Sequence, residues 1–238
     1  MEQESGSKGK HPVLGLLLKT AVAAGGVYLL RENSFSIFTL LLYSLVFWAI
    51  YLWPPFNNRK FLVSAFGLFA LPILLPPAGA GLTWVILIIW TSAFVLLIGV
   101  KNLILLRRHG SYEAVHLLLV FGAGILYFLG VLPLISQIIL FIIFFLLFRE
   151  FYFVLAPHYP QRLALVGVAE ALILTQIAWL LSFLSINFLA AASLLALASF
   201  TLHDLMLHHF QGTLSRQILL RTTTLFVILS LALLLLPR

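Results

Sequence analysis

The chain of 238 residues contains no cysteine and very little charge. Without cysteine it can form neither a disulfide framework nor a thiolate zinc site, and it gives no indication of its redox compartment. Charged residues make up 9% of the sequence and hydrophobic residues 63%, whereas a soluble domain has roughly 25% charged residues. We therefore expect a protein that lies in the lipid bilayer.

Acidic residues are the scarcest charged group, with seven in the chain and a single aspartate, Asp204. One aspartate excludes the aspartate-rich motifs of membrane prenyltransferases. The chain also lacks a paired-glutamate motif like that of CAAX-type proteases and a Gly-x-Ser-x-Gly signature of the rhomboid type. The net charge of +7 comes from basic residues that stand singly or in pairs between apolar runs. That pattern indicates membrane topology, and we expect no nucleic-acid partner.

Short polar breaks separate long apolar stretches along most of the chain. About 20 apolar residues cross ~30 Å of hydrocarbon, and the proline, glycine and charge in the breaks end helices. Short connections favour antiparallel neighbours. The sequence predicts an all-α, polytopic integral membrane protein with about nine transmembrane helices in one up-and-down bundle over 12–238. The predicted spans are 12–30, 35–53, 61–77, 83–106, 114–131, 134–156, 162–184, 188–208 and 216–236.

The basic residues predict the orientation of the bundle, because cytoplasmic loops carry an excess of lysine and arginine. With a cytoplasmic N-terminus, Arg31 and Arg238 fall outside and ten basic residues fall inside. The ten are Lys8, Lys10, Arg59, Lys60, Arg107, Arg108, Arg149, Arg162, Arg216 and Arg221. We expect a multi-pass protein of a bacterial-type inner (cytoplasmic) membrane, with its N-terminus inside, its C-terminus outside and residues 1–11 as a disordered cytoplasmic tail.

A regular spacing suggests repeated hairpins that begin near 34, 82, 134 and 187. The polar pairs Lys101-Asn102, Arg149-Glu150 and His203-Asp204 fall at one depth when the hairpins are aligned. Two interpretations stay open. The hairpins are duplicated units that place a ring of polar groups under the cytoplasmic surface, or the spacing is the period of any bundle of ~20-residue spans, which we prefer.

The stretch TLHDLMLHHF, residues 201–210, concentrates histidine at the predicted cytoplasmic side. Residues three or four apart share a helix face, so Glu113 with His116, and Asp204 with His208, can each offer a carboxylate and an imidazole to a metal ion. Such units build di-metal centres in helical bundles and suit zinc, iron or manganese. Only one pair has the Glu-x-x-His spacing. We therefore favour the interpretation that these polar side chains simply lie at the membrane interface, with their polar tips in water. We expect no cofactor. The alternative is a divalent transition metal bound by these four residues.

Glu170 lies about 12 Å below the predicted cytoplasmic boundary, where a carboxylate normally faces a partner inside the bundle. Lys101, Arg149 and His203 are the candidate partners, and a structural ion pair is favoured over a catalytic or proton-linked role. For a catalytic role the candidates are Glu170, Glu113, Glu150 and His203. The candidates for binding a lipid headgroup are Arg107, Arg108, Arg149 and Arg162.

Three functional classes are compatible with this pattern. The favoured class is a non-enzymatic integral subunit or scaffold of a membrane complex, which would have a membrane protein or a second copy of itself as partner besides the bilayer. The alternative is an enzyme of the cytoplasmic leaflet that acts on a lipid or lipid-linked substrate through a His/carboxylate cluster. A small-solute or proton-linked transporter ranks third, because no charged residue accompanies the proline-interrupted helix near Pro72.

Overall fold

The computed structural model describes residues 12–32, 36–53, 55, 58–75, 80–102, 108–130, 136–155, 160–210 and 212–235. Within these ranges all regular secondary structure is helical, as the sequence predicts. The elements are α1 (Pro12–Glu32), α2 (Ile37–Leu52), the 3-10 helix η1 (Asn58–Phe61), α3 (Leu62–Leu74), α4 (Ala80–Lys101), α5 (Arg108–Phe128), α6 (Ser136–Leu155), α7 (Pro160–Ser182), α8 (Phe188–Phe210) and α9 (Arg216–Leu235). The predicted tail 1–11 lies outside the described residues.

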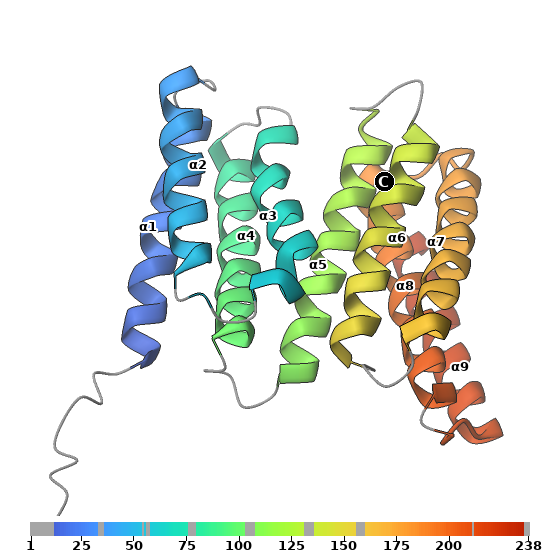
Figure 1. Ribbon diagram of the computed structural model, residues 1–238. Coiled ribbons are helices and arrows are strands. Elements are labelled where there is room, and N and C mark those ends of the chain that lie inside the picture. Colours follow the sequence, from blue (N-terminus) through green and yellow to red (C-terminus); the bar gives the residue numbers. More distant parts are fainter. Residues whose placement is uncertain are drawn as a thin grey trace, which may run out of the picture.

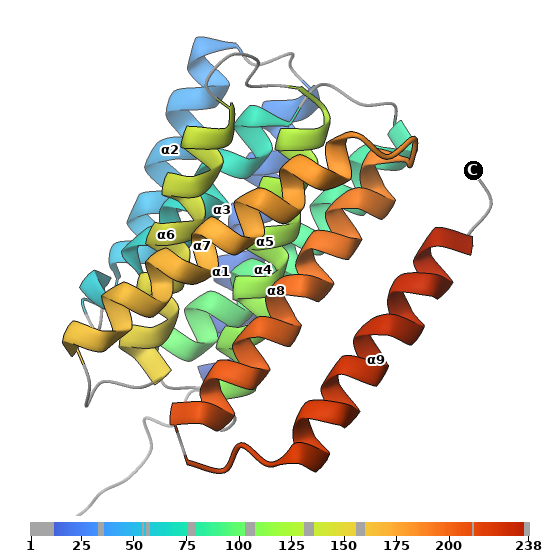
Figure 2. The same cartoon turned by 90° about the vertical axis from the view of Figure 1, so that its right-hand side faces the viewer.

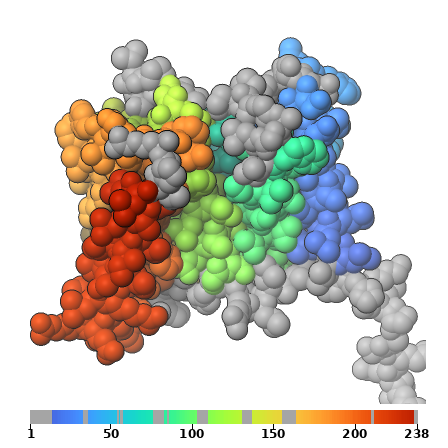
Figure 3. All heavy atoms as spheres, turned by 180° about the vertical axis from the view of Figure 1, so that it is seen from behind, coloured from blue at the N-terminus to red at the C-terminus, as the bar shows by residue number. Residues whose placement is uncertain are grey.

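The helices run up and down and form two neighbouring groups (Figure 1). Helices α1 to α4 pack against one another, α5 to α8 form the second group, and α3 and α4 contact α5 between them. Helix α9 lies beside α8 at the edge of the bundle (Figure 2), and it is on the outside of the molecule in Figure 3. The predicted repetition of hairpins stays a prediction.

Six helices of the described residues are long and apolar enough to cross a membrane. These candidate spans are Leu14–Glu32, Gly110–Phe128, Gln137–Val154, Ala164–Ser182, Phe188–His209 and Arg216–Leu235. Two apolar helices, Ile37–Leu52 and Ile86–Lys101, are shorter. Helix α3 has 13 residues and measures about 20 Å at ~1.5 Å per residue, less than the ~30 Å hydrocarbon core. The membrane class is therefore supported, whereas nine crossings remain a prediction.

One end of the bundle carries most of the described basic residues, and we name it the basic end. It is the end at which α1 begins and at which α8 connects to α9, the lower end in Figure 1. Arg59 and Lys60 in η1, Lys101 at the end of α4 and Arg216 at the start of α9 lie there. Arg31, in the last turn of α1, lies at the opposite end.

Helix α3 contains a proline whose backbone defect is repaired by a neighbouring helix. Pro72 has no N–H to offer the carbonyl of Leu68 four residues earlier. The indole Nε1 of Trp90 in α4 donates to this Leu68 carbonyl oxygen at 2.7 Å. Trp90 is almost fully buried, where an unpaired carbonyl is costly. The proline is therefore accommodated inside a packed helix instead of ending it.

Glycine brings the helices of the second group close together. An ideal Cβ at Gly124 of α5 would lie 3.3 Å from both the Cα and Cβ atoms of Ala192 in α8. A Cβ at Gly167 of α7 would lie 3.4 Å from the backbone nitrogen of Arg149 in α6. Small residues at such crossings let the backbones of membrane helices approach. The approach places the polar side chains of α5, α6, α7 and α8 within reach of one another.

The connection from α8 to α9 is fixed by a glycine in the left-handed conformation. Gly212 has φ 66°, and its N–H donates to the carbonyl of His209 at 3.1 Å. The N–H of Thr213 donates to the carbonyl of His208 at 3.0 Å. These two bonds form a Schellman motif, which ends α8 and turns the chain into α9.

Candidate functional site

Glu150 of α6 caps the start of α3. Its two carboxylate oxygens accept hydrogen bonds from the backbone N–H groups of Val63, at 2.6 Å, and Ser64, at 3.0 Å. Val63 and Ser64 are the second and third residues of α3, whose own N-cap residue, Phe61, supplies no side-chain bond. These N–H groups have no partner inside the helix, and a negative charge at a helix N-terminus is favourable. A carboxylate from another helix therefore does the work of a local cap.

Two hydroxyl groups complete the surroundings of Glu150. The Tyr112 hydroxyl of α5 donates to Glu150 Oε1 at 2.7 Å, and the Ser64 hydroxyl donates to the same oxygen. Tyr112 Oη and Ser64 Oγ also lie 3.2 Å apart. All three side chains are buried. This group, which we name the capping cluster, ties α3, α5 and α6 together at the basic end.

A second buried group joins four helices. Glu170 Oε2 of α7 lies 2.9 Å from His203 Nδ1 of α8, a distance typical of an ion pair, although the contact is not aligned as a hydrogen bond. The Tyr152 hydroxyl of α6 donates to Glu170 Oε1. His203 Nε2 lies 2.8 Å from His116 Nε2 of α5. We name these four residues the histidine cluster.

Aromatic rings enclose the two histidines. Phe151 of α6 stacks on His203 with ring centroids 4.3 Å apart and lies 4.6 Å from the His116 ring. Phe148 packs against the edge of His203 at 4.9 Å. Both histidines and Glu170 have no solvent exposure. Because the rings exclude water, the polar atoms of the cluster depend on one another for partners.

The two clusters share helices. Tyr112 and His116 are four residues apart on one face of α5, and Glu150 and Tyr152 come from one turn of α6. Buried polar groups from α3, α5, α6, α7 and α8 therefore form a buried polar layer made of two separate clusters, and the Phe151 ring packs against both Tyr112 and His116. The structure places Glu150 in one closed group and Glu170, His116 and His203 in the other. That these residues lie towards a cytoplasmic face stays a prediction.

The histidine cluster is arranged as a chain rather than as a metal centre. A metal ion needs several ligand atoms directed at one point, each about 2 Å from it. His203 instead uses Nδ1 towards Glu170 and Nε2 towards His116, and the short Nε2–Nε2 contact requires a proton between the two nitrogens. Within the described ranges no group of three histidine or acidic side chains is placed to hold a metal. The geometry can hold a proton and pass it between neighbours.

The proposed metal ligands are divided between two places. His116 belongs to the buried histidine cluster, while Glu113 is half-buried one turn earlier in α5. Asp204 and His208 face α9, where Asp204 Oδ1 lies 3.6 Å from His208 Nε2 and Asp204 Oδ2 accepts a hydrogen bond from Thr222 at 2.9 Å. Among the residues that the structure describes, no three of these four are placed to hold one metal ion.

Two of the basic candidates, Lys101 and Arg149, have side chains that the structure describes. Lys101 is buried, donates to the carbonyl of Tyr51 and lies 4.7 Å above the Tyr51 ring. Among the three candidate partners of Glu170, the structure brings His203 to it. Arg149 is exposed on α6. Arg107, and the side chains of Arg108 and Arg162, lie outside the described residues.

The hydroxyl residues of both clusters are the part that sequence reasoning misses. Tyr112, Tyr152 and Ser64 donate to the two buried carboxylates. A usable signal existed for Tyr112, which precedes His116 by four residues and so shares its helix face. Ser64 gives no such signal, because its bond joins residues 86 positions apart.

No protein-family model, no curated protein and no solved structure matches this chain. Likeness to other proteins therefore supplies no activity. The buried polar layer and the exposed faces of the helices are the features from which a function can be inferred.

Proposed function

We propose that this protein is a non-enzymatic integral subunit or scaffold of a membrane complex. The observation that supports this most is the use of both buried carboxylates for joining helices. Glu150 holds the start of α3 against α5 and α6, and Glu170 connects α6, α7 and α8. Buried polar groups that bond to one another make a helix bundle rigid and specify one arrangement of its core, and this supports a structural role.

The size of the connections supports the same function. The helices follow one another closely along the whole described chain, so no segment between them is long enough for a separate soluble domain. A protein of this kind acts through its surfaces in the bilayer and at its two faces. We place its N-terminus in the cytoplasm and its C-terminus outside, because the basic end then faces inward.

Site-specific photo-crosslinking in native membranes tests the subunit proposal. Benzoylphenylalanine would replace Leu41 and Leu45 on one face of α2, or Leu165 and Leu172 on one face of α7, all of which are exposed. We expect a protein adduct of constant mass from one of these faces, and the same variant should shift the native complex to a covalent form. The buried Phe144 position serves as the control and should give no intermolecular adduct. A monomeric protein that yields only lipid adducts at every position would overturn the proposal.

One observation favours an enzyme of the cytoplasmic leaflet as a second candidate. The chain from Glu170 through His203 to His116 contains three groups that exchange protons and are in contact. General acid–base catalysis needs such groups within hydrogen-bond reach of each other and of a substrate. Glu170→Gln and His203→Asn each remove a group that can gain and lose a proton, and each changes the shape of the side chain only slightly. If both variants keep the fold and the native complex but alter the lipid composition of the host membrane, the enzyme replaces the scaffold.

A further inference from the structure

A groove between α8 and α9 lies outside both clusters. Its volume is about 430 Å³, within the roughly 300–1,000 Å³ of sites that bind small molecules. Helix α9 packs chiefly on α8, and only 6% of its candidate span is buried, against 33% to 50% for the other five spans. The two helices therefore leave a space along their contact at the edge of the bundle.

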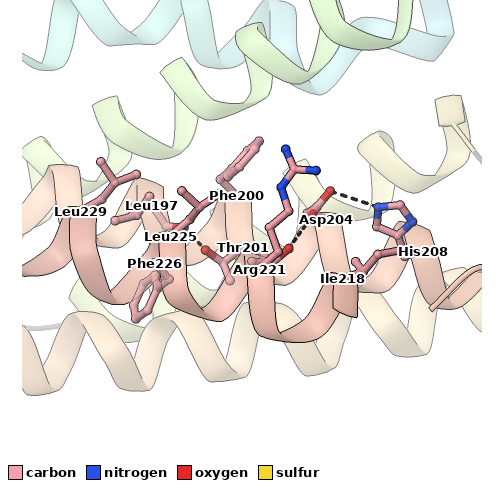
Figure 4. A pocket seen from close by; sticks show the side chains of 11 residues that line it. Leu197, Phe200, Thr201, Asp204, His208, Ile218, Arg221, Leu225, Phe226 and Leu229 are labelled. Carbon is pink, nitrogen blue, oxygen red and sulfur yellow. Dashed lines mark hydrogen bonds and ion pairs between the residues drawn. The ribbon is translucent and has the colours of Figure 1, made fainter. Parts of the chain in front are cut away.

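The lining of this groove changes from polar to apolar along its length. Asp204, His208 and Arg221 line one end, whereas Phe226 and Leu229 line the other (Figure 4). Asp204 is six residues before the end of α8 and Arg221 is five after the start of α9, so both lie about 8–9 Å inside the helix ends. Leu229 is eight residues, or about 12 Å, further along α9. This gradient runs along α8 and α9, two candidate membrane spans, and so matches a headgroup followed by an acyl chain.

The charged end of the groove offers one cation and one anion that do not neutralise each other. The exposed Arg221 guanidinium forms no hydrogen bond or ion pair within the described part of the chain. It points towards the end of the groove that holds Asp204 (Figure 4). Asp204 is held in place by Thr222 and His208. A guanidinium is the preferred partner of a phosphate, and a carboxylate beside it selects a ligand that also carries a positive charge.

We propose that this groove binds one phospholipid with a primary-ammonium headgroup, of the phosphatidylethanolamine class. Its phosphate contacts Arg221, its ammonium group contacts Asp204, and one acyl chain lies between α8 and α9 against Phe226 and Leu229. Phosphatidylglycerol is disfavoured, because its phosphate can contact Arg221 but its neutral glycerol headgroup brings no positive charge to the Asp204 carboxylate. The site is independent of the subunit proposal and of the orientation of the chain.

Native mass spectrometry of the full chain tests this site. The protein would be reconstituted in nanodiscs of equal parts phosphatidylethanolamine and phosphatidylglycerol and then released from them. We expect one retained lipid per chain, with phosphatidylethanolamine enriched about tenfold. Retention of no lipid, or of both lipids in the ratio of the nanodisc, would mean an ordinary lipid-facing surface and would overturn the proposal. Enrichment of phosphatidylglycerol would overturn the assignment of the headgroup.

Three variants and one control separate the contacts. Arg221→Gln should lower the retention of both lipids about tenfold, and Asp204→Asn, which keeps an acceptor for Thr222, should bring the two lipids to parity. Leu229→Trp at an exposed position should displace the acyl chain and reduce retention while the unfolding midpoint stays unchanged. Arg216→Gln is the control, because Arg216 is exposed on the same helix but does not line the groove. If R216Q and R221Q lost equal amounts of bound lipid, the groove would not be a specific binding site.

Discussion

At the scale of single residues, Glu150 stands out because it is buried and bonds to donors from two other helices. Its backbone partners, Val63 and Ser64, begin a helix that has no cap of its own. In a hydrocarbon environment there is no water to replace the lost acceptor. The cost of removing Glu150 is therefore the cost of leaving these donors unpaired.

Glu150→Ala should lower the free energy of unfolding by about 3 kcal/mol, because two backbone N–H groups and two hydroxyl groups lose their acceptor. Glu150→Gln should lose about half as much, since its amide oxygen still accepts. Titration of the detergent-solubilised protein with SDS, followed by circular dichroism, measures both values. The adjacent, exposed Arg149→Ala is the control and should stay within about 0.5 kcal/mol of the unchanged protein. An equal loss for R149A and E150A would argue against the trans cap.

Glu170 and His203 should behave as a coupled pair. Breaking a buried ion pair by removing one partner costs about 3–5 kcal/mol, because the other is left uncompensated. Glu170→Gln and His203→Asn should each show a large loss of unfolding free energy, and the double variant should lose about 1–3 kcal/mol less than the sum. The control is a second double-mutant cycle that pairs Glu170→Gln with His208→Asn. His208 is a half-exposed histidine on the same helix as His203. Additive losses in both cycles would show that Glu170 and His203 do not interact.

Single residues also show which contacts of the site can be predicted from the sequence. Glu170 is readable as a buried carboxylate that needs a partner, and His203 is one of the three candidates that its depth suggests. The capping role of Glu150 is not readable, because it depends on backbone N–H groups 86 and 87 positions away. The pairing of Glu113 with His116 stays a prediction, whereas the contact of His116 with His203 is not readable because it comes from another helix.

At the scale of elements, the close approach of α5 and α8 positions both histidines. Gly124 lies in α5 two turns after His116, and Ala192 precedes His203 by three turns in α8. The length of an apolar stretch is enough to predict that it forms a helix. The predicted spans therefore agree with the observed helices within a few residues over most of the chain. The close crossing does not follow, since it depends on which of several small residues meet.

Gly124→Leu should push α5 away from α8 and lower the free energy of unfolding by about 1–3 kcal/mol, the usual cost of overpacking. Gly25→Leu in α1 is the control, because a Cβ there meets nothing within 4 Å. Thermal or SDS unfolding compares the two variants. The interpretation fails if G25L is as destabilising as G124L, because contact with α8 would then not explain the loss; leucine is a better helix former than glycine, so helix propensity alone predicts no loss at either position.

At the scale of the whole molecule, the absence of cysteine allows the orientation to be tested without a cysteine-free background. Leu214→Cys lies in the exposed α8–α9 connection at the basic end, and Ser185→Cys lies in the exposed α7–α8 connection at the other. In intact spheroplasts a membrane-impermeant maleimide should label S185C, while L214C should react only after permeabilisation. The reverse pattern would place the N-terminus outside. Labelling of both in intact spheroplasts would mean that α8 does not cross the membrane.

The cap that α6 supplies to α3 also constrains the order of assembly. Helix α3 leaves the ribosome 87 residues before the carboxylate that completes its first turn, which at roughly 5–20 residues per second is an interval of several seconds. During that interval a short helix with unpaired N–H groups is poorly suited to enter lipid alone. We expect α3 to wait beside the translocon or at the membrane surface and to settle only when α6 has been inserted, so that the first half of the protein matures together with the second.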